Sequence, residues 1–319
     1  MKILQMMGPR EPVLHDTAIP QPGPGEVLMR ITGVTTCPQW DLHLRHAEPM
    51  FVGHKFEYPY APGQPGHEAT GTVEAVGPGV TGLAAGDRVS AWRDAGHHVP
   101  GCYAQFVVHK ADNVIRVPEG LPDEAVAPVE LAMCVATVYR VLRDMGAVAG
   151  RRFGVTGLGP AGLVALQMAR AEGATELVGF DLNAARRARA LALGLADEVY
   201  DPRDADALAG RAKMASAGDC VGAKASVEFL LDHSSDVVAL FGVQREDYTY
   251  RPQHNRLRLC GYKGHSRESA EYAVDLIGRG LLDLAPLVTH RLPLERYAEG
   301  IDLLEAQAAV KVMFLPWEG

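Results

Sequence analysis

A glycine-rich turn between a predicted strand and a predicted helix constrains the fold more than any other feature of the chain. The strand Arg152–Thr156 leads into Gly157-Leu158-Gly159-Pro160-Ala161-Gly162, and a helix is predicted over Pro160–Glu172. In such a G-x-G-x-x-G turn, the first glycine permits the tight bend, the second lets a pyrophosphate approach the backbone, and the third lets helix and strand pack closely. The helix N-terminus offers unpaired N–H groups to the phosphates. We therefore expect a dinucleotide to contact Gly157, Gly159, Pro160, Ala161 and Gly162, although α/β proteins that bind no nucleotide also contain such turns.

An acidic residue lies where a ribose-binding carboxylate is expected. The next predicted strand, Leu177–Phe180, is followed by Asp181, 24 residues after Gly157. A carboxylate accepts hydrogen bonds from ribose hydroxyls and repels a 2′-phosphate, which predicts NAD rather than NADP. Arg186 follows closely and can reach the ribose or the adenine. Together with Arg187 it can also weaken the exclusion of NADP.

The pattern of predicted secondary structure changes near residue 120. Earlier residues form short β-type runs separated by glycine and proline, which predict a β-rich domain with turns. Later residues alternate between helices and strands, which predicts an α/β fold with a doubly wound parallel sheet of the Rossmann type. The earlier runs are Val27–Val34, Thr70–Val76, Asp87–Trp92, Tyr103–Val108 and Asn113–Val117. The later elements include the helices Asp123–Met145 and Asn183–Leu195, the strands Val237–Phe241 and Leu257–Cys260, and a closing strand, Val312–Leu315, that can return to the first domain.

Composition excludes several classes of protein. The 319 residues carry a formal net charge of −8 with acids and bases mixed, so the chain has no basic run for a nucleic-acid backbone. No apolar run approaches the roughly 18 residues of a membrane helix, and the N-terminus does not resemble a signal peptide. We therefore expect a cytoplasmic protein without nucleic-acid or membrane partners. The five cysteines are widely spaced and include no C-x-x-C pair, which argues against a disulfide framework.

Three places in the first 130 residues offer metal ligands. They are Cys37, the pair His67 and Glu68, and Glu130. A catalytic zinc takes about three protein ligands from cysteine, histidine and carboxylate and keeps one position open. Taken singly, a cysteine is more often part of the core than a ligand, and a His-Glu pair in a proline- and glycine-rich loop is often a surface pair.

Motifs along nearly the whole chain resemble those of the zinc-containing medium-chain dehydrogenases, and within them the polyol (sorbitol-type) branch. The order and spacing of the motifs match as well as their residue types. They are Pro24-Gly25-Glu26-Val27, Gly66-His67-Glu68, Val76-Gly77-Pro78-Gly79, Gly86-Asp87-Arg88-Val89, the glycine turn, and Lys311-Val312 before the closing strand.

The resemblance implies a site and a domain organisation. Cys37 and His67 are expected to bind one catalytic Zn²⁺, with Glu68 as a direct or transient ligand and Glu130 bound directly or through water. A GroES-like catalytic domain is expected from residues 1–124 and 283–319, around a NAD-binding domain of residues 125–282. The resemblance also implies a homodimer or homotetramer.

The segment after Cys37 departs from the family pattern. Relatives read Cys-x-Ser/Thr-Asp-x-His, whereas the run Cys37–His43 is one residue longer before its aspartate. Gln39 or Trp40 therefore stands where a proton-relaying hydroxyl is expected, and Gln39 can orient water without relaying a proton in the same way. Thr35 or Thr36 can replace that hydroxyl.

Two side chains of the same run keep expected roles. Asp41 can orient His67 through a hydrogen bond without binding the metal itself. His43 can pass the substrate proton to solvent.

Two further segments also depart from the pattern. Only Cys102 is present where a structural zinc lobe has four cysteines, so we expect one zinc per chain. His97 and His98 lie in that shortened loop as substrate contacts or, more commonly for such residues, as solvated side chains. The fourth strand of the nucleotide domain is hard to recognise, since Asp219–Gly222 is very short before a helix over Lys224–His233.

These patterns together predict a zinc-dependent, NAD-linked oxidoreductase that interconverts a functionalised, secondary alcohol or polyol with its carbonyl. An anionic substrate group can meet Arg93 or Arg45. Two alternatives stay open: a zinc-independent double-bond reductase or non-redox enzyme that uses bound NAD on the same fold, and a non-catalytic NAD(H)-binding protein. Candidate pocket residues are Gln39, Trp40, Phe51, Trp92, Arg93 and Met133.

Overall fold

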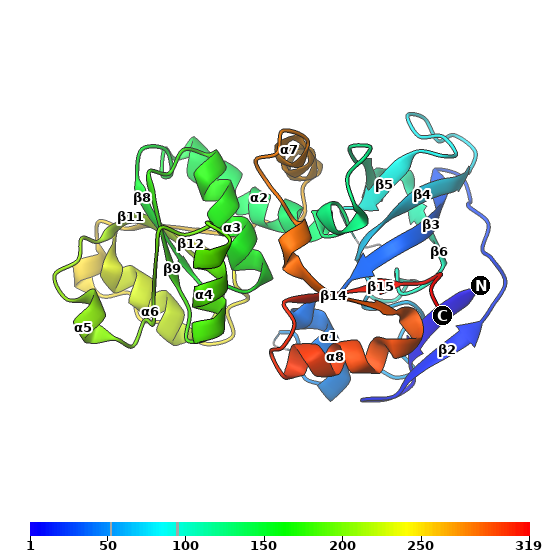
Figure 1. Ribbon diagram of the computed structural model, residues 1–319, viewed down its shortest axis with the longest axis horizontal. Coiled ribbons are helices and arrows are strands. Elements are labelled where there is room, and N and C mark those ends of the chain that lie inside the picture. Colours follow the sequence, from blue (N-terminus) through cyan, green and yellow to red (C-terminus); the bar gives the residue numbers. More distant parts are fainter. Residues whose placement is uncertain (52, 94–95) are drawn as a thin grey trace. The chain divides into compact units, whose positions relative to one another are not determined.

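The computed structural model describes residues 1–51, 53–93 and 96–319. The chain divides into two compact units, which Figure 1 shows as ribbons. Unit 1 combines Met1–Leu131 with Asp283–Gly319, and unit 2 is Ala132–Leu282. The division falls inside helix α2 (Val129–Asp144).

A seven-stranded sheet forms the centre of unit 1. Strand β3 is its longest strand and is paired on both sides, because its apolar side chains are buried along its length. The strand order is β14 (Val288–Pro293), β15 (Lys311–Leu315), β3 (Glu26–Thr35), β4 (Glu68–Val76), β5 (Arg88–Ala91) and β7 (Val114–Arg116), with β6 (Phe106–Lys110) also paired to β3. The antiparallel pairing of β15 with β3 brings the C-terminal segment into the N-terminal sheet.

The other elements of unit 1 cover this sheet. Helix α1 (Pro38–His46) packs against helix α8 (Tyr297–Glu305), so the two ends of the chain meet around the end of β3. Strands β1 (Lys2–Met6) and β2 (Pro12–Asp16) form a separate antiparallel pair. Short 3₁₀ turns complete the unit at Ala111–Asn113, Asp123–Ala125, Ala285–Leu287 and Leu294–Arg296.

Unit 2 is a six-stranded parallel sheet with helices packed on it. The order is β10 (Glu198–Tyr200), β9 (Glu176–Phe180), β8 (Arg152–Thr156), β11 (Met214–Asp219), β12 (Ser234–Leu240) and β13 (Arg258–Gly261). The order reverses between β8 and β11, as in the 3-2-1-4-5-6 arrangement of dinucleotide-binding sheets. The helices are α3 (Pro160–Ala171), α4 (Ala184–Ala192), α5 (Ala205–Leu208), α6 (Lys224–His233) and α7 (Arg267–Gly278), with a 3₁₀ turn at Pro252–His254.

Both predicted folds, the β-rich domain and the doubly wound parallel sheet, are confirmed. The helix termini follow local chemistry: Asn183 accepts hydrogen bonds from the first turn of α4, and Ser266 does so for α7. The predicted helix over Asp123–Met145 is shorter, because a 3₁₀ turn ends at Ala125 before α2 begins at Val129.

The expectation of a very short fourth strand is wrong. The strand is β11, which has six residues and ends at Asp219, where the very short segment was expected to begin. Its sequence, MASAGD, lacks branched apolar residues, which are the usual signal of a buried parallel strand. Small side chains suffice because β11 lies between β8 and β12 and is covered by α6.

One helical segment reaches the length and apolar composition of a membrane span. It is Asp123–Asp144, with a mean hydropathy of 1.6 over its most apolar window and at most two charged residues there. The expectation that no stretch approaches this length therefore needs correction. Because 78% of the window is buried, the segment also fits the core helix of a soluble protein.

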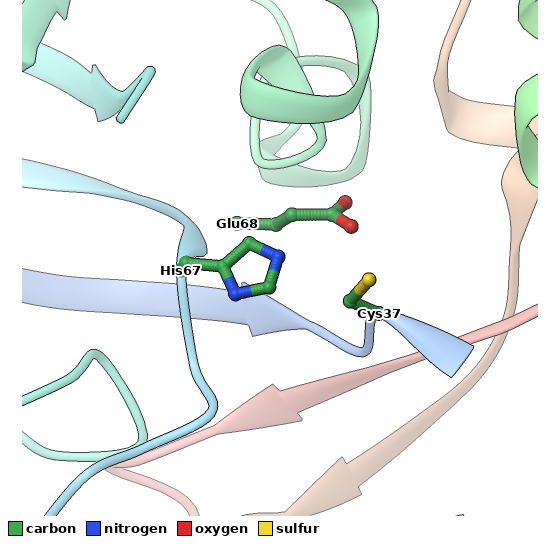
Figure 2. A group of neighbouring side chains, drawn as sticks. All are labelled: Cys37, His67 and Glu68. Atoms are coloured by element: carbon green, nitrogen blue, oxygen red, sulfur yellow. The ribbon is translucent and has the colours of Figure 1, made fainter. Parts of the chain in front are cut away.

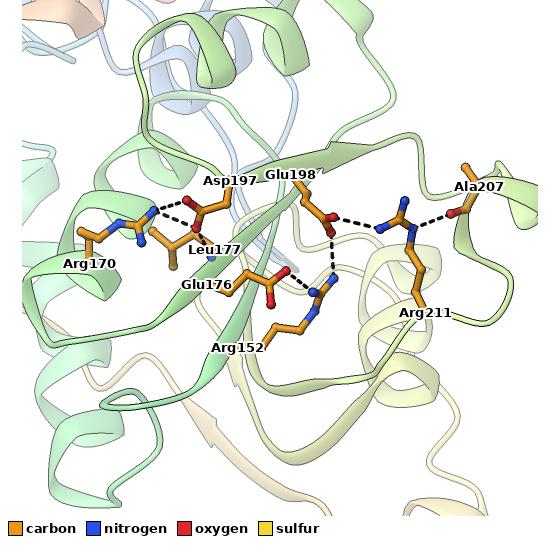
Figure 3. A network of polar contacts seen from close by, with 8 residues as sticks. All are labelled: Arg152, Arg170, Glu176, Leu177, Asp197, Glu198, Ala207 and Arg211. Atoms are coloured by element: carbon orange, nitrogen blue, oxygen red, sulfur yellow. Dashed lines mark hydrogen bonds and ion pairs between the residues drawn. The ribbon is translucent and has the colours of Figure 1, made fainter.

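Ion pairs tie together three neighbouring strands of unit 2 (Figure 3). Arg152 on β8 donates to Glu176 on β9 and, at 2.9 Å, to Glu198 on β10. Arg211 donates to the other oxygen of Glu198 at 2.9 Å. Burial would raise the pKa of Glu198, but the hydrogen bond from Arg152 and the charge of Arg211 hold it below its ordinary value.

We predict that Arg152→Met lowers the free energy of unfolding by about 1 kcal/mol at pH 7, since partly exposed pairs contribute modestly. A carboxylate with a lowered folded-state pKa stabilises the fold above its unfolded pKa, and that contribution is lost on acidification. The difference from the unsubstituted protein should therefore shrink as the pH falls below about 4. Urea denaturation at both pH values measures this. Arg267→Met, which breaks an exposed pair with Glu271 on α7, is the control and should cost less; an equal or larger cost would contradict the role of Arg152.

Candidate metal centre and dinucleotide turn

Cys37 lies between β3 and α1, where the chain turns from sheet to helix. It is the N-cap of α1, and Pro38 takes the first helical position, where the missing N–H costs no hydrogen bond. Its backbone N–H donates to Asp41 Oδ2 at 2.8 Å. This contact fixes the start of the helix and with it the direction of the cysteine side chain.

His67 and Glu68 are placed by a tight loop that leads into β4. The loop packs on Gly101–Tyr103 through backbone hydrogen bonds, including Cys102 N–H to the Gly66 carbonyl at 2.7 Å. A Cβ at Gly66 would lie 2.6 Å from the Tyr103 nitrogen, so only glycine permits this approach. The close packing holds His67 at the start of β4, with 7% of its surface exposed.

The predicted ligands Cys37, His67 and Glu68 converge, as Figure 2 shows. One ligand atom of each lies within 4.8 Å of the others. Glu130, in the first turn of α2, comes in beside them, with its Oε2 3.8 Å from His67 Nε2. The structure thus brings together all four residues that sequence motifs marked as metal ligands.

The electrostatics of this cluster favour a cation. Burial would lower the pKa of His67, but a hydrogen bond with Cys37 and the charges of Glu130, Cys37 and Glu68 hold it well above its ordinary value. Burial raises the pKa of Glu68, which Lys311 opposes. Thiolate, imidazole and carboxylate are the donor set that Zn²⁺ prefers. The residues present therefore fit a zinc ion in both donor type and charge.

Lys311 is a site residue whose contact sequence reasoning missed. Its Nζ is buried and donates to both oxygens of Glu68 at 2.6 Å and to the Thr36 carbonyl at 2.6 Å. The motif Lys311-Val312 was recognised, but its contact with Glu68 spans 243 residues of sequence. The signal that marks it is a lone lysine within an otherwise apolar strand, Lys311–Leu315.

Asp41 holds the start of α1 rather than the ligand histidine. It accepts hydrogen bonds from Cys37 N–H, from Tyr103 at 2.9 Å and from Tyr297 at 2.8 Å. None of these described hydrogen bonds is with His67. The expected orienting hydrogen bond is therefore not among them, and His67 acts on Asp41 through its charge. Burial raises the pKa of Asp41 to about 6, against the hydrogen bonds from the two tyrosines and the charge of His67, which lower it.

The hydroxyls of Thr35 and Thr36 both form hydrogen bonds with neighbouring strands. Thr35 Oγ1 donates to Glu68 Oε2 at 3.1 Å, and Thr36 Oγ1 accepts from Val312 N–H at 3.0 Å. Both residues are buried. They therefore join β3 to its neighbours and are poorly placed to relay a proton to solvent.

Gln39 and His43 line one surface pocket beside α1. The amide nitrogen of Gln39 is buried and finds no hydrogen-bond partner in the described part of the structure. His43 contacts the Glu48 carbonyl through Nδ1 at 3.2 Å. The rest of the pocket wall is Pro38, Leu42, His46, Glu48 and Glu305.

The other candidate pocket residues divide into two groups. Trp92 is core, with 5% of its surface exposed and its indole N–H bonded to the Asp112 carbonyl, and Arg45 is paired with Asp302 and Glu305. Met133 is fully buried in unit 2. The remaining residues are accessible: Trp40 is half-buried with its ring centroid 4.1 Å from that of His97, while Phe51, Arg93 and His98 are exposed.

The glycine turn of unit 2 has the shape that a pyrophosphate requires. A Cβ at Gly162 would lie 1.8 Å from the Gly157 carbonyl, whereas a Cβ at Gly159 would meet nothing within 4 Å. Gly157 has a φ of +81° and makes the bend. Gly159 is the N-cap of α3 and has no side chain to cap the helix, so Pro160 and Ala161 begin a helix whose terminus is open to a phosphate.

Asp181 follows β9 and orders the same turn. Its Oδ2 accepts from Leu158 N–H at 2.8 Å, and its Oδ1 accepts from Asn183 N–H at 2.8 Å. Arg186 lies 3.8 Å from Oδ2. A carboxylate has further lone pairs for ribose hydroxyls, so the arrangement fits a nucleotide.

Comparison with known proteins agrees with this geometry. Residues 23–119 match the alcohol dehydrogenase GroES-like domain family, and residues 160–277 match the zinc-binding dehydrogenase family. The sorbitol dehydrogenase of Pongo abelii is 30% identical, with 97% of this chain and 94% of the relative covered. The L-threonine 3-dehydrogenase of Bacillus subtilis (strain 168) is 27% identical, with 95% of each covered. A crystal structure of an NAD-dependent alcohol dehydrogenase matches with a TM-score of 0.81 at 26% identity, over 99% of both chains.

One domain family matches part of unit 1 and the other matches part of unit 2. The similarity to sorbitol dehydrogenase extends over nearly the whole chain. The chain therefore belongs to the zinc-containing medium-chain alcohol and polyol dehydrogenases, as its sequence motifs predicted.

Proposed function

We propose that this dehydrogenase uses one Zn²⁺ and NAD to interconvert a functionalised secondary alcohol or polyol with its carbonyl. The observation that carries the proposal is the convergence of Cys37, His67 and Glu68, with Glu130 beside them, in a largely buried place. A thiol, an imidazole and two carboxylates, one of them paired with Lys311, supply the donor types that Zn²⁺ prefers.

The chain supplies positions for both partners of the reaction. Zn²⁺ held by Cys37, His67 and a carboxylate would act as a Lewis acid that lowers the pKa of a substrate hydroxyl. NAD⁺ on the glycine turn of unit 2 would accept hydride, since the cofactor carries the redox chemistry. The protein itself contributes binding, orientation and the path of the proton.

Gln39 and His43 divide the task that a relay hydroxyl performs in relatives. The amide nitrogen of Gln39, which is buried and finds no hydrogen-bond partner among the described residues, would donate a hydrogen bond to the substrate oxygen. His43, which lines the same pocket, accepts the proton and releases it to solvent. Accessible aromatic and polar groups around Trp40 and His97 support a substrate that carries further functional groups.

The fold-related alternatives differ in their metal requirement. A double-bond reductase of this fold needs no zinc ligands, and a non-catalytic NAD(H)-binding protein needs no proton path, so the ligand cluster disfavours both. The expected homodimer or homotetramer and the expected cytoplasmic location stay predictions. The exposed strand β13 at the end of the unit 2 sheet supports subunit pairing there.

We predict that Cys37→Ala abolishes turnover and removes the bound zinc while NADH binding survives, because the thiolate is a ligand and the glycine turn is in the other unit. Elemental analysis, an NAD-coupled screen of alcohols and polyols, and NADH fluorescence measure the three quantities. Cys260→Ala is the control and should keep its zinc. Full activity or an unchanged zinc content in Cys37→Ala would remove the basis of the proposal.

We predict that Asp181→Asn lowers kcat/KM for NAD about tenfold and raises the ratio of NADP to NAD use, because it removes the charge that binds ribose and repels a 2′-phosphate. Arg186→Ala should shift the ratio in the opposite direction, since it removes the cation beside Asp181. Steady-state kinetics with both cofactors measure the ratio. A ratio unchanged in both variants would show that Asp181 does not select the cofactor.

We predict that Gly159→Ala raises the Kd for NADH at least tenfold with an unchanged Tm. The new Cβ meets no protein atom within 4 Å, at an ordinary φ of −75°, and fills the space where a pyrophosphate would lie. Gly162→Ala should instead lower Tm, because its Cβ would clash with the Gly157 carbonyl. Fluorescence titration and thermal unfolding test the pair, and tight NADH binding by Gly159→Ala would place the cofactor elsewhere.

A further inference from the structure

Asp219 joins the carboxyl ends of three neighbouring strands of unit 2. It is fully buried and is the last residue of β11. Its Oδ1 accepts hydrogen bonds from Thr156, the last residue of β8, at 3.1 Å and from Ser226 on α6 at 2.6 Å. Its Oδ2 accepts from Gly222 N–H at 2.9 Å, and its backbone carbonyl accepts from Gly242 N–H, just after β12, at 2.9 Å. One acidic residue therefore holds the ends of β8, β11 and β12 together.

The side chain of Gln244 is oriented by the same carboxylate. Its Nε2 donates to Asp219 Oδ2 at 3.2 Å and to the Gly242 carbonyl at 2.9 Å. Because both partners are acceptors, the NH₂ end of the amide must face them, and Oε1 and Nε2 are not interchangeable. Oε1 is buried and finds no hydrogen-bond partner among the residues that the structure describes. A buried carbonyl oxygen without a donor is costly, so it indicates a donor that comes from outside the protein.

The order of the strands indicates which part of a dinucleotide lies near this oxygen. A dinucleotide lies across the carboxyl ends of such a sheet where the order reverses, here between β8 and β11. With the pyrophosphate at the glycine turn after β8 and the adenosine ribose at Asp181 after β9, the other half extends over β11 and β12. Neighbouring strands lie about 4.8 Å apart, so β12 is about 10 Å from β8. The second ribose follows the pyrophosphate and the nicotinamide ring follows that ribose, so the ring is the part that reaches β12.

The loops after β11 and β12 are packed closely against each other. A Cβ at Gly242 would lie 2.3 Å from the Gly222 nitrogen, and one at Gly222 would lie 2.3 Å from the Val243 carbonyl oxygen. Gln244 follows directly, and its chain neighbours Val243 and Arg245 are exposed. The acceptor is therefore held by close packing in a loop that a ligand can reach from solvent.

The carboxamide NH₂ is the one strong hydrogen-bond donor on a nicotinamide ring. We propose that Gln244 Oε1 accepts a hydrogen bond from this NH₂ and that Gln244 is thereby a specificity-determining residue for the cofactor. Asp219 acts through Gln244, whose amide it holds in a fixed orientation, and is a positioning residue. The inference rests on the proposed use of NAD and deepens it.

A cofactor analogue tests the hydrogen bond directly. In the 3-acetylpyridine analogue of NADH, a methyl group replaces the NH₂, so the donor is absent while the ring and its carbonyl remain. We predict that the unsubstituted protein binds NADH about tenfold more tightly than this analogue, because the analogue leaves the buried acceptor unpaired. In Gln244→Met, which has no acceptor, the two Kd values should differ by less than about twofold. Isothermal titration calorimetry of the full chain measures all four Kd values.

A control ligand and a control variant separate this effect from a general loss of binding. ADP-ribose lacks the nicotinamide ring, so its Kd should be the same in Gln244→Met as in the unsubstituted protein. Gln253→Met replaces another glutamine of unit 2, which is exposed and donates to Asp232 rather than to Asp219. It should keep the full preference for NADH over the analogue.

Two variants of Asp219 test its positioning role. Asp219→Ala removes the acceptor of Gln244 Nε2 and should reduce the preference for NADH over the analogue. Asp219→Asn should restore most of that preference, because its oxygen can still accept from Nε2 while its NH₂ donates to the hydroxyl of Thr156 or Ser226. The ratio of the two Kd values is the readout, since a loss of stability alone does not change it. If Asp219→Ala does not fold, Gln244→Met decides.

Either of two results would overturn the proposal. One is equal affinity of the unsubstituted protein for NADH and for the analogue, and the other is a preference that persists undiminished in Gln244→Met. Both would assign water as the partner of Oε1. Failure of the proposed function is recognised separately, because the unsubstituted protein would then bind neither NADH nor ADP-ribose.

Discussion

Unit 1 is organised around the burial of several acidic groups in one small volume. Asp41, Glu68 and Glu130 are all buried within reach of Cys37 and His67, and buried charge is tolerated only where it is compensated. Each acid is compensated differently: Asp41 by two tyrosine hydroxyls and a backbone N–H, and Glu68 by a lysine. The thiol of Cys37 and Glu130 lie beside the third group, His67, with Glu130 Oε2 3.8 Å from its Nε2.

This constraint explains why the C-terminal segment returns to the first sheet. Tyr297 on α8 and Lys311 on β15 each supply a donor to an acid on the N-terminal part of the chain. Val312 also exchanges two hydrogen bonds with Thr36, just before the ligand Cys37. Pairing of β15 with β3 is thus part of the site as well as of the sheet.

Sequence patterns predicted those features of the structure that depend on residues close together in the chain. The glycine turn, α3 and β8 follow from backbone sterics within about twenty residues, and the ligand residues follow from recognisable motifs. Strand β11 was missed because its small side chains carry no apolar signal, although neighbours bury it on both sides. The partners of Asp41 and Glu68 could not be predicted, because Tyr297 and Lys311 lie more than 240 residues further along the chain.

The extra residue after Cys37 has consequences that follow from helix geometry. It places Asp41 four positions after the N-cap, where its carboxylate turns back onto Cys37 N–H instead of reaching across to His67. It also separates Gln39 from His43 by four positions, which puts both on one face of α1, one turn apart. They line the same pocket for that reason. A single added residue therefore both turns Asp41 back onto Cys37 N–H and brings an amide and an imidazole into the wall of one pocket.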